Sequence, residues 1–299
     1  MALESYLAGE IAQDCADGLL SRRDAIRRLV LLGLSVPAAG ILLAACGGDS
    51  KPPVAASGSS TTVASSSGAP VGDAPTSAEV VRFAGPSGEL TAAFAASPTP
   101  KAALLVIHEN RGLTPHFHDV VARFAAEGYT AICVDLVSAE GGTAALDEGA
   151  VQSALGGAPV ARLLGDLRAG IDELEQRAPG RKLGTVGFCF GGGMVWNLLQ
   201  DGESRLAAAV PFYGPAPDAP DFSRAKAAVL GIYGELDARV NASRDSADAA
   251  LTAAGLTHEM KTFAGADHAF FNDTGARYNA TAAAEANTLV LAWFDRYLT

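Results

Sequence analysis

The chain is short of positive charge. Its 299 residues include 22 Lys and Arg against 33 Asp and Glu, which gives a formal net charge of −11. A nucleic-acid binder needs clustered basic side chains to displace counterions from phosphates, so this balance argues against that class and favours a small organic partner. Aromatic residues make up only 7%, but 49% of the residues are hydrophobic, which suffices for one α/β domain of ordinary size.

Cysteine is also scarce, with four residues at positions 15, 46, 133 and 189. No two of them form a C-x-x-C pair, which argues against a thiol redox protein. Cys133 and Cys189 could form one disulfide in an oxidising compartment. The patterns below place Cys133 in a buried strand and need the sulfur of Cys189 for chemistry, so we expect two free thiols.

Charge is missing altogether from residues 29–48, and a basic cluster with the pair Arg22 and Arg23 precedes this stretch. Leu-Ala-Ala stands directly before Cys46, as in bacterial lipoprotein signals that are cleaved before a lipidated cysteine. The paired arginines resemble a Tat export signal. We therefore expect residues 1–46 to be a signal peptide, with Cys46 as the lipidation site and the mature N-terminus.

This signal also predicts a location. The lipid on Cys46 would anchor the protein to the outer side of the cytoplasmic membrane, in a periplasm or at a cell surface. Two alternatives stay open, namely export by the Sec route and an uncleaved signal anchor, because about 20 uncharged residues can just span a bilayer. Pro37 and the glycines at 33 and 40 weaken a permanent spanning helix.

Residues 47–78 have almost no large apolar side chains and are rich in Gly, Ser, Ala, Pro and Thr. Such a segment cannot bury enough apolar surface to offset the entropy lost on ordering. We expect a flexible tether that holds the folded domain, residues 79–299, clear of the membrane.

Within residues 79–299, short apolar runs alternate with amphipathic stretches, as in βαβ units. The continuous apolar runs predict an α/β fold with a mostly parallel central sheet and helices on both faces. The expected strands are 80–83, 90–95, 102–107, 130–134, 182–186, 207–212, 227–233 and 258–263, and the expected helices are 115–127, 160–177, 192–200, 242–254 and 280–297. The Gly- and Ala-rich segment 138–159 is expected to form an irregular flap over the site.

Residues 187–191, Gly-Phe-Cys-Phe-Gly, lie between a predicted strand and a predicted helix. In this context a G-x-S-x-G-like pattern forms a nucleophile elbow, here with cysteine in place of serine. The turn is tight, so Gly187 and Gly191 have to be small, and the adjacent start of a helix favours the thiolate of Cys189. An inert cysteine or a phosphate-binding loop are the alternatives, but no Lys-Ser/Thr follows and no G-x-G-x-x-G occurs.

A nucleophilic cysteine needs a base, and the base needs an orienting acid. Asp237 and His268 follow two successive predicted strands, so the chain order is nucleophile, acid, base, which is that of α/β-hydrolases. Glu235 and Asp267 compete for the acid role. Asp237 is favoured by its place in G-x-x-D-x-x-V, whereas Asp267 adjoins the histidine and could hardly face its ring.

Four motifs in order resemble those of the dienelactone hydrolase family. They are residues 107–113 (Ile-His-Glu-Asn-Arg-Gly-Leu), 187–192 (Gly-Phe-Cys-Phe-Gly-Gly), 234–237 (Gly-Glu-Leu-Asp) and 265–271 (Gly-Ala-Asp-His-Ala-Phe-Phe). The resemblance covers essentially all of residues 79–299. It implies the α/β-hydrolase fold and hydrolysis of lactone or ester bonds through an acyl-enzyme, without a metal or an organic cofactor.

The resemblance also implies roles for residues that composition alone would leave at the surface. A Glu at the position of Glu109 contacts the nucleophilic thiol in this family and helps to govern its ionisation. The backbone N–H groups of Phe190 and Asn110 are expected to form the oxyanion hole, which usually contributes the largest electrostatic stabilisation. We expect His108 to be structural, and His116, His118 and His258 to be surface or helix-start residues.

The resemblance to the family fails at the positions that bind the substrate. Family members that bind a substrate carboxylate use two arginines, one after the Asp-Leu strand end and one shortly after the catalytic histidine. Here residues 137–140 hold no arginine, and Asn272 stands four residues after His268. Arg111, Arg239 and Arg277 are the possible substitutes. We therefore expect neutral esters to react as well as carboxylate-bearing lactones.

These observations predict a carboxylic ester hydrolase that acts on a small lactone or ester through Cys189, His268 and Asp237. A thioesterase or a general carboxylesterase on the same scaffold is the nearest alternative. A non-catalytic surface lipoprotein that binds a ligand is the alternative from another class, although such a protein has no need of an elbow thiol with a matching acid and base.

Overall fold

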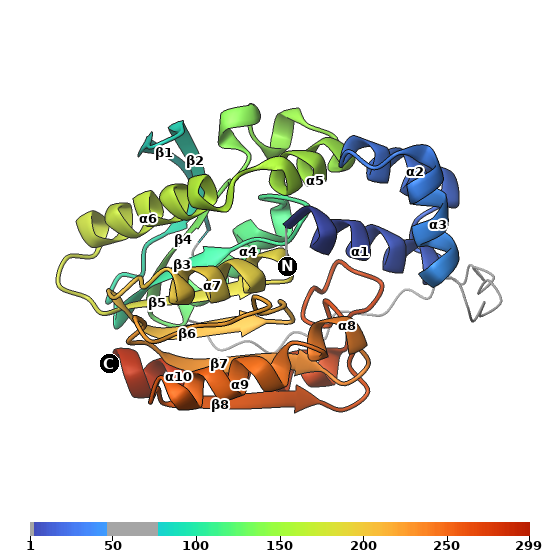
Figure 1. Cartoon of the computed structure of the whole chain (residues 1–299). Helices are drawn as coiled ribbons and strands as arrows, with labels where there is room; N and C mark the ends of the chain where they lie inside the picture. The colour runs from blue at the N-terminus through green and yellow to red at the C-terminus, as the bar shows by residue number, and fades with distance from the viewer. Residues whose placement is uncertain (1–2, 47–76) are drawn as a thin grey trace, which may run out of the picture.

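The apolar runs of the sequence form an eight-stranded sheet, shown in Figure 1 in a computed structural model that describes residues 3–46 and 77–299. The strand order is β1-β2-β4-β3-β5-β6-β7-β8. β1 and β2 form an antiparallel hairpin at one edge, β2 also pairs antiparallel with β4, and the remaining pairs are parallel. The strands are β1 (Glu79–Gly85), β2 (Gly88–Ala95), β3 (Ala102–Ile107), β4 (Tyr129–Val134), β5 (Leu183–Phe188), β6 (Leu206–Phe212), β7 (Ala228–Gly234) and β8 (His258–Phe263).

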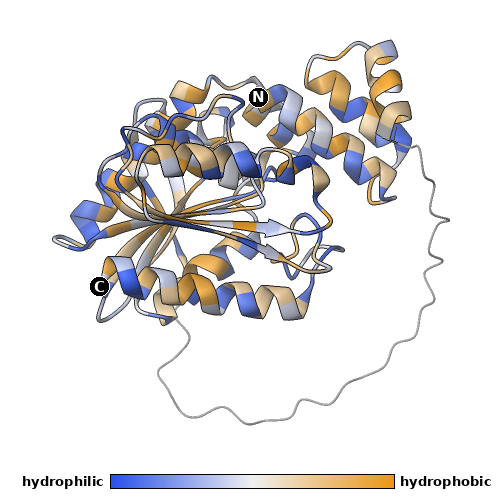
Figure 2. Cartoon of the chain, turned by 60° about the horizontal axis from the view of Figure 1, so that its bottom comes forward, coloured by the Kyte–Doolittle hydropathy of each residue, from blue (hydrophilic) through white to orange (hydrophobic). Residues whose placement is uncertain are grey.

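Helices cover the sheet because its central strands are apolar on both faces. Every residue of β3, β4, β5 and β7 is buried. The helices after β1 are α4 (Pro115–Ala126), α5 (Glu148–Gly157), α6 (Val160–Arg177), α7 (Phe190–Gln200), α8 (Ala238–Asn241), α9 (Arg244–Ala253) and α10 (Ala280–Leu298). Figure 2 shows hydrophobic and hydrophilic residues interleaved along the helices, as expected for elements with one face on the core and one in water.

The expected sheet and helices are confirmed, with element ends mostly within two residues of the predictions. The expected irregular flap at 138–159 is wrong. This segment forms two short 3₁₀ turns (Ser138–Glu140 and Thr143–Ala145) and helix α5, whose first turn is capped by Asp147 through a hydrogen bond from the backbone N–H of Ala150 (2.8 Å).

The N-terminal segment, treated above as a removable leader, is helical and packed against the domain in the structure. It forms α1 (Leu3–Ala16), α2 (Arg22–Leu31) and α3 (Val36–Cys46). Ser21 caps α2 by accepting a hydrogen bond from the backbone N–H of Asp24 (3.1 Å). Arg28 of α2 forms an ion pair with Glu148 of α5 (2.8 Å).

Helix α1 packs because one side of it is apolar, with Leu7 and Ile11 fully buried. In Figure 1 it lies across the end of the sheet at which the parallel strands terminate. Among the residues that the structure describes, no helix combines the length and apolar character that crossing a membrane requires. Cleavage before Cys46 stays a prediction, and the expected tether falls almost wholly outside the described residues.

Candidate active site

Cys189 sits at a strained turn between β5 and α7. Its backbone has φ 57° and ψ −116°, a conformation that non-glycine residues rarely adopt. A Cβ on Gly187 would lie 2.1 Å from the carbonyl oxygen of Gly191, and a Cβ on Gly191 would lie 2.3 Å from that of Ile107. Both contacts are with backbone that cannot move aside, so the turn requires glycine at both positions.

The turn places the sulfur at the N-terminus of α7. Phe190 is the first residue of this helix, so its N–H belongs to the first turn, whose amides have no acceptor within the helix. Asn110 follows β3 and lines the same cavity as Cys189. The oxyanion-hole role of these two N–H groups stays a prediction. Cys133, as expected, is a free thiol buried in β4, and Cys189 is free as well.

His268 and Asp237 meet at the ends of neighbouring strands. Nδ1 of His268 lies 2.5 Å from Oδ2 of Asp237, and both side chains are buried. The other oxygen of Asp237 accepts a hydrogen bond from the backbone N–H of Val240 (3.2 Å). Asp267 instead accepts the backbone N–H of His268 (2.7 Å), so the acid that faces the imidazole ring is Asp237, as expected.

The environment of His268 favours its charged form. Burial by itself lowers the pKa of the imidazole, but the charge and the hydrogen bond of Asp237, together with Cys189, outweigh burial and raise the pKa to about 10. The ring is therefore protonated at neutral pH. It can give a proton to a leaving group and stabilise a thiolate.

A cavity of about 350 Å³ opens beside these residues. Its lining includes Glu109, Asn110, Arg111, His116, Cys189, His268, Asn272 and Arg277, together with Glu10 and Asp14 of α1. The size suits a small organic substrate. The segment 138–159 does not contribute to this lining.

Glu109 is buried beside the cavity and its carboxylate is fully engaged. One oxygen accepts the hydroxyl of Tyr213 (3.3 Å) and the other accepts the side-chain amide of Asn272 (2.7 Å). Burial, Glu109 and, to a smaller degree, Cys189 raise the pKa of Tyr213 well above its ordinary value. In this structure the hydrogen bonds of Glu109 thus go to Tyr213 and Asn272.

Two of the other histidines are buried in the domain. His108 is structural, as expected: it is fully buried, and its Nε2 accepts the backbone N–H of Leu136 (3.1 Å). His116 lies in the first turn of α4, one of the two places expected for it, but it is buried, and its Nδ1 lies 3.0 Å from Asp273. No local sequence pattern could predict this pair, because its two residues are 157 positions apart.

The three candidate arginines all lie around the site, and each is paired with an acid. Arg111 lies 2.9 Å from Glu148. Arg277 lies 2.9 Å from Asp14 and 2.5 Å from Asp17, and Arg239 forms a close ion pair with Glu10. No motif predicted the acidic partners on α1.

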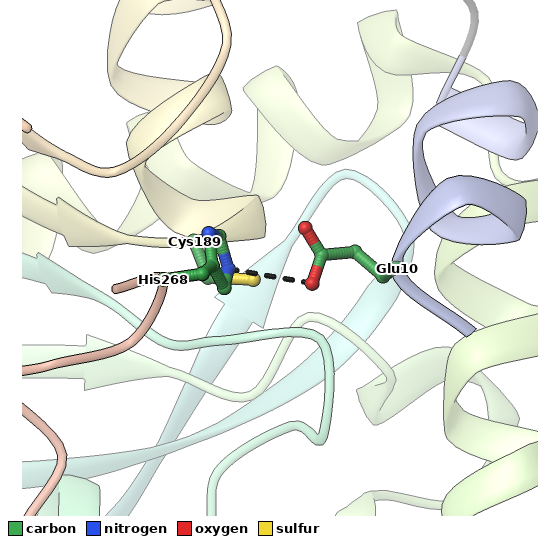
Figure 3. A group of neighbouring side chains, drawn as sticks. All are labelled: Glu10, Cys189 and His268. Carbon is green, nitrogen blue, oxygen red and sulfur yellow. Dashed lines mark ion pairs between the residues drawn. The ribbon is translucent and has the colours of Figure 1, made fainter. Parts of the chain in front are cut away.

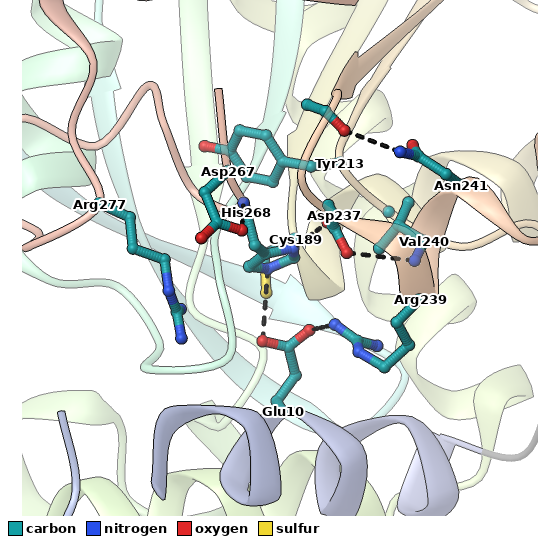
Figure 4. Close-up of polar contacts among 12 residues, drawn as sticks. Glu10, Cys189, Tyr213, Asp237, Arg239, Val240, Asn241, Asp267, His268 and Arg277 are labelled. Atoms are coloured by element: carbon teal, nitrogen blue, oxygen red, sulfur yellow. Dashed lines mark hydrogen bonds and ion pairs between the residues drawn. The ribbon is translucent and has the colours of Figure 1, made fainter. Parts of the chain in front are cut away.

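Helix α1 supplies two residues to the centre of the site that the sequence analysis missed. The Tyr6 hydroxyl lies 3.2 Å from Sγ of Cys189, and Oε2 of Glu10 lies 3.3 Å from Nε2 of His268. Figure 3 shows Glu10 reaching from its helix toward the sulfur and the imidazole. Figure 4 shows Glu10 between these groups and Arg239.

Glu10, Cys189 and His268 also form the one group within the described part of the chain that has metal-ligand geometry, since their ligand atoms all lie within 4.8 Å of one another. The ion pair between Glu10 and Arg239 already neutralises the carboxylate. The contacts of this group are therefore accounted for by charge pairing.

Comparison with known proteins gives this geometry a family. The sequence matches the dienelactone hydrolase family over residues 90–298. The chain belongs to the dienelactone hydrolase family. A protein of Saccharolobus solfataricus named "Putative carboxymethylenebutenolidase" is 30% identical over 243 residues, which span 68% of this chain and 93% of the relative. A protein of the same name from Escherichia coli O157:H7 is 31% identical over 67% of this chain and 79% of its own length.

Solved structures agree with this membership. The crystal structure titled as a "Putative Dienelactone Hydrolase" from Klebsiella pneumoniae is 28% identical and superposes with a TM-score of 0.65, covering 74% of this chain and 99% of the other. The protein is thus a dienelactone hydrolase-like member of the α/β-hydrolase superfamily. The family acts on small molecules, in keeping with the size of the cavity.

Proposed function

We propose that this protein hydrolyses a lactone or carboxylic ester bond through an acyl-enzyme on Cys189. The observation that carries the proposal is the position of His268, held by Asp237 on one side and next to a cysteine on a strained elbow on the other. A lone cysteine or histidine would mean little. Here a cysteine, an aspartate and a histidine follow the ends of β5, β7 and β8 and lie close together. Covalent catalysis by a nucleophile, a base and an orienting acid needs this arrangement.

In the first step the sulfur of Cys189 attacks the carbonyl carbon. The carbon–oxygen bond breaks, and His268 gives its proton to the departing oxygen, so that a thioester and an alcohol result. The backbone N–H groups of Phe190 and Asn110 stabilise the oxyanion of the tetrahedral intermediate. Water then attacks the thioester, His268 takes a proton from it, and the thiolate and a carboxylic acid are released.

The substrate class within this proposal follows from the arginines. Arg111 and Arg277 line the cavity, and Arg111 is paired with Glu148, whereas the acids paired with Arg277 lie on α1 and leave with the predicted leader. No family arginine stands in the loop after Asp135 or four residues after His268. Small neutral esters and lactones therefore fit at least as well as carboxylate-bearing ones. Thioesters share the same attack geometry and are distinguished by leaving-group preference alone.

Assay of the protein purified after export tests the proposal. Small aryl esters should be hydrolysed, prior treatment with iodoacetamide should abolish the activity, and the acyl group should be found on Cys189 by mass spectrometry. A protein that binds aryl esters without turnover would instead be a ligand-binding lipoprotein. Turnover that persists after Cys189 is fully alkylated would remove this cysteine from the mechanism.

We further propose that Cys46 is lipidated and that the mature protein sits on the outer side of the cytoplasmic membrane, periplasmic or at the cell surface. Support comes from the uncharged stretch, the small residues before Cys46 and the paired arginines. Cys46→Ser should block processing or release the protein from the membrane fraction. Mass spectrometry of the native protein that finds a mature N-terminus elsewhere, without lipid, would refute the anchor.

A further inference from the structure

Helix α1 occupies the space in which the reaction would take place. For attack, a carbonyl carbon has to approach the sulfur of Cys189 to about 3–3.5 Å. The Tyr6 hydroxyl already lies 3.2 Å from that sulfur, and Tyr6 is buried. An ester and the Tyr6 side chain therefore cannot be present at the same time.

The same helix also blocks His268, which acts as the general acid. The oxygen that leaves the substrate has to come within hydrogen-bond distance of Nε2 of His268 to receive its proton. Oε2 of Glu10 lies 3.3 Å from that nitrogen, and the carboxylate is buried. Glu10 thus stands in the position of the leaving group. A carboxylate is a poor electrophile, so the thiol cannot process it.

Charge complementarity holds the helix in this place. Arg239 pairs with Glu10 and lies over the ring of Tyr6, with its guanidinium carbon 4.8 Å from the ring centre. One turn further along α1, Asp14 pairs with Arg277 of the cavity wall (2.9 Å). Two basic residues of the domain thus recognise acids on one face of α1, and Leu7 and Ile11 of the same helix are buried.

We propose that helix α1 is a built-in inhibitor of the enzyme, which keeps the full-length chain latent by placing Tyr6 and Glu10 over Cys189 and His268. This inference rests on the proposed function, because α1 can inhibit the protein only if the protein is an enzyme. Removal of residues 1–45 with the leader, as the sequence predicts, takes α1 away and frees Cys189 and His268 of their contacts with Tyr6 and Glu10. Export and activation are then a single event, and the enzyme does not act on esters before it leaves the cytoplasm.

The test is carried out on the full-length chain and reads the nucleophile directly. The rate at which iodoacetamide alkylates Cys189 is measured by mass spectrometry of its peptide in wild type, Glu10→Lys and Tyr6→Ala. Glu10→Lys turns the ion pair with Arg239 into a repulsion, and Tyr6→Ala removes the group that touches the sulfur. Both should speed alkylation at least about tenfold, because a helix that has lost a buried pair opens more often.

Glu4→Lys is the matched control, because Glu4 lies on the exposed side of the same helix and undergoes the same change of charge. Its alkylation rate should stay within about twofold of wild type. Near-ultraviolet circular dichroism checks the fold of each variant. If Glu10→Lys does not fold, the alkylation rate of Tyr6→Ala alone tests the inference. Wild-type alkylation rates in Glu10→Lys and Tyr6→Ala would overturn the inference.

Hydrolysis of a small aryl ester by the same variants separates this inference from the proposed function. Faster alkylation with faster hydrolysis supports both. Faster alkylation without any hydrolysis supports α1 as a cover over Cys189 and refutes the hydrolase proposal.

Discussion

At the scale of single residues, Cys189, His268 and Asp237 differ in how much each should matter. The sulfur forms the bond to the substrate and the imidazole moves the proton, so Cys189→Ala and His268→Ala should each abolish aryl-ester hydrolysis by the processed enzyme. Asp237→Asn should retain more activity, though still several orders of magnitude below wild type, because Asp237 orients the ring and stabilises its charge. Steady-state kinetics measure this. Equal activity of Cys189→Ala and wild type would contradict the proposed triad.

The role of Glu109 in the ionisation of Cys189 can be tested directly. Its carboxylate is buried and hydrogen-bonded to Tyr213 and Asn272, and Glu109 and Cys189 line the same cavity. Removal of this negative charge should make the thiolate easier to form. Glu109→Gln should therefore shift the pH profile of Cys189 alkylation toward lower pH, measured in the Tyr6→Ala background where the thiol is open.

Asn272→Ala is the control for that experiment, because it removes a partner of Glu109 and keeps the charge. Its profile should resemble that of the parent chain. If the profiles of Glu109→Gln and the parent superimpose, Glu109 acts as packing and the enzyme is a Cys-His-Asp hydrolase without a carboxylate that governs the thiol.

At the scale of elements, the elbow is the least tolerant feature of the fold. A Cβ at Gly191 would lie 2.3 Å from the carbonyl oxygen of Ile107, so Gly191→Ala has to push β3 away from α7. We expect it to lower the free energy of unfolding by on the order of 3 kcal/mol or more and to abolish activity. Chemical denaturation measures the loss.

Gly193→Ala is the matched control on the same helix. Its Cβ would lie 3.7 Å from the nearest atom, the carbonyl oxygen of Pro215, which is ordinary contact. Since alanine is more favourable than glycine inside a helix by about 1 kcal/mol, this change should be neutral or slightly stabilising. If both alanine variants are equally stable, the tight turn is not what requires glycine at Gly191.

The elements also show what the sequence can and cannot predict. The strand runs 102–107 and 258–263 were predicted with their observed ends, because continuous apolar or alternating runs and their flanking turns are local properties. Helix α5 was missed, since its glycines and small apolar residues carry a weak helical signal and it packs against α1 and α2, which are far away in the sequence. Tyr6 and Cys189 are 183 residues apart, and no local pattern joins them.

The candidate site divides in the same way. Cys189, Asp237 and His268 could be found because each lies in a motif at a strand end, and the fold brings such ends together. Glu10 and Arg239 have no motif. Their pairing depends on how α1 docks, which is decided by shape and charge over the whole surface. The leader-like composition of residues 3–46 predicts cleavage and carries no local signal for packing against the domain.

At the scale of the whole molecule, the charged pair of His268 and Asp237 should make stability depend on pH. The pKa of His268 is raised from its ordinary value near 6.5 to about 10, so the folded state binds a proton that the unfolded state releases. Its stabilising contribution is fully present below about pH 6.5 and is lost as the pH rises toward 10. The free energy of unfolding should therefore fall between these values, by up to a few kcal/mol for a buried group.

Urea denaturation of the full-length chain at pH 6, 7, 8, 9 and 10 measures this decline. In His268→Gln the decline should largely disappear, because the proton that links folding to pH is no longer there. His258→Gln removes a half-buried histidine at the edge strand β8 and should leave the slope of wild type unchanged. Parallel curves for wild type and His268→Gln would show that the imidazole is not held in its charged form. The role of Asp237 in holding the imidazolium would then have to be abandoned.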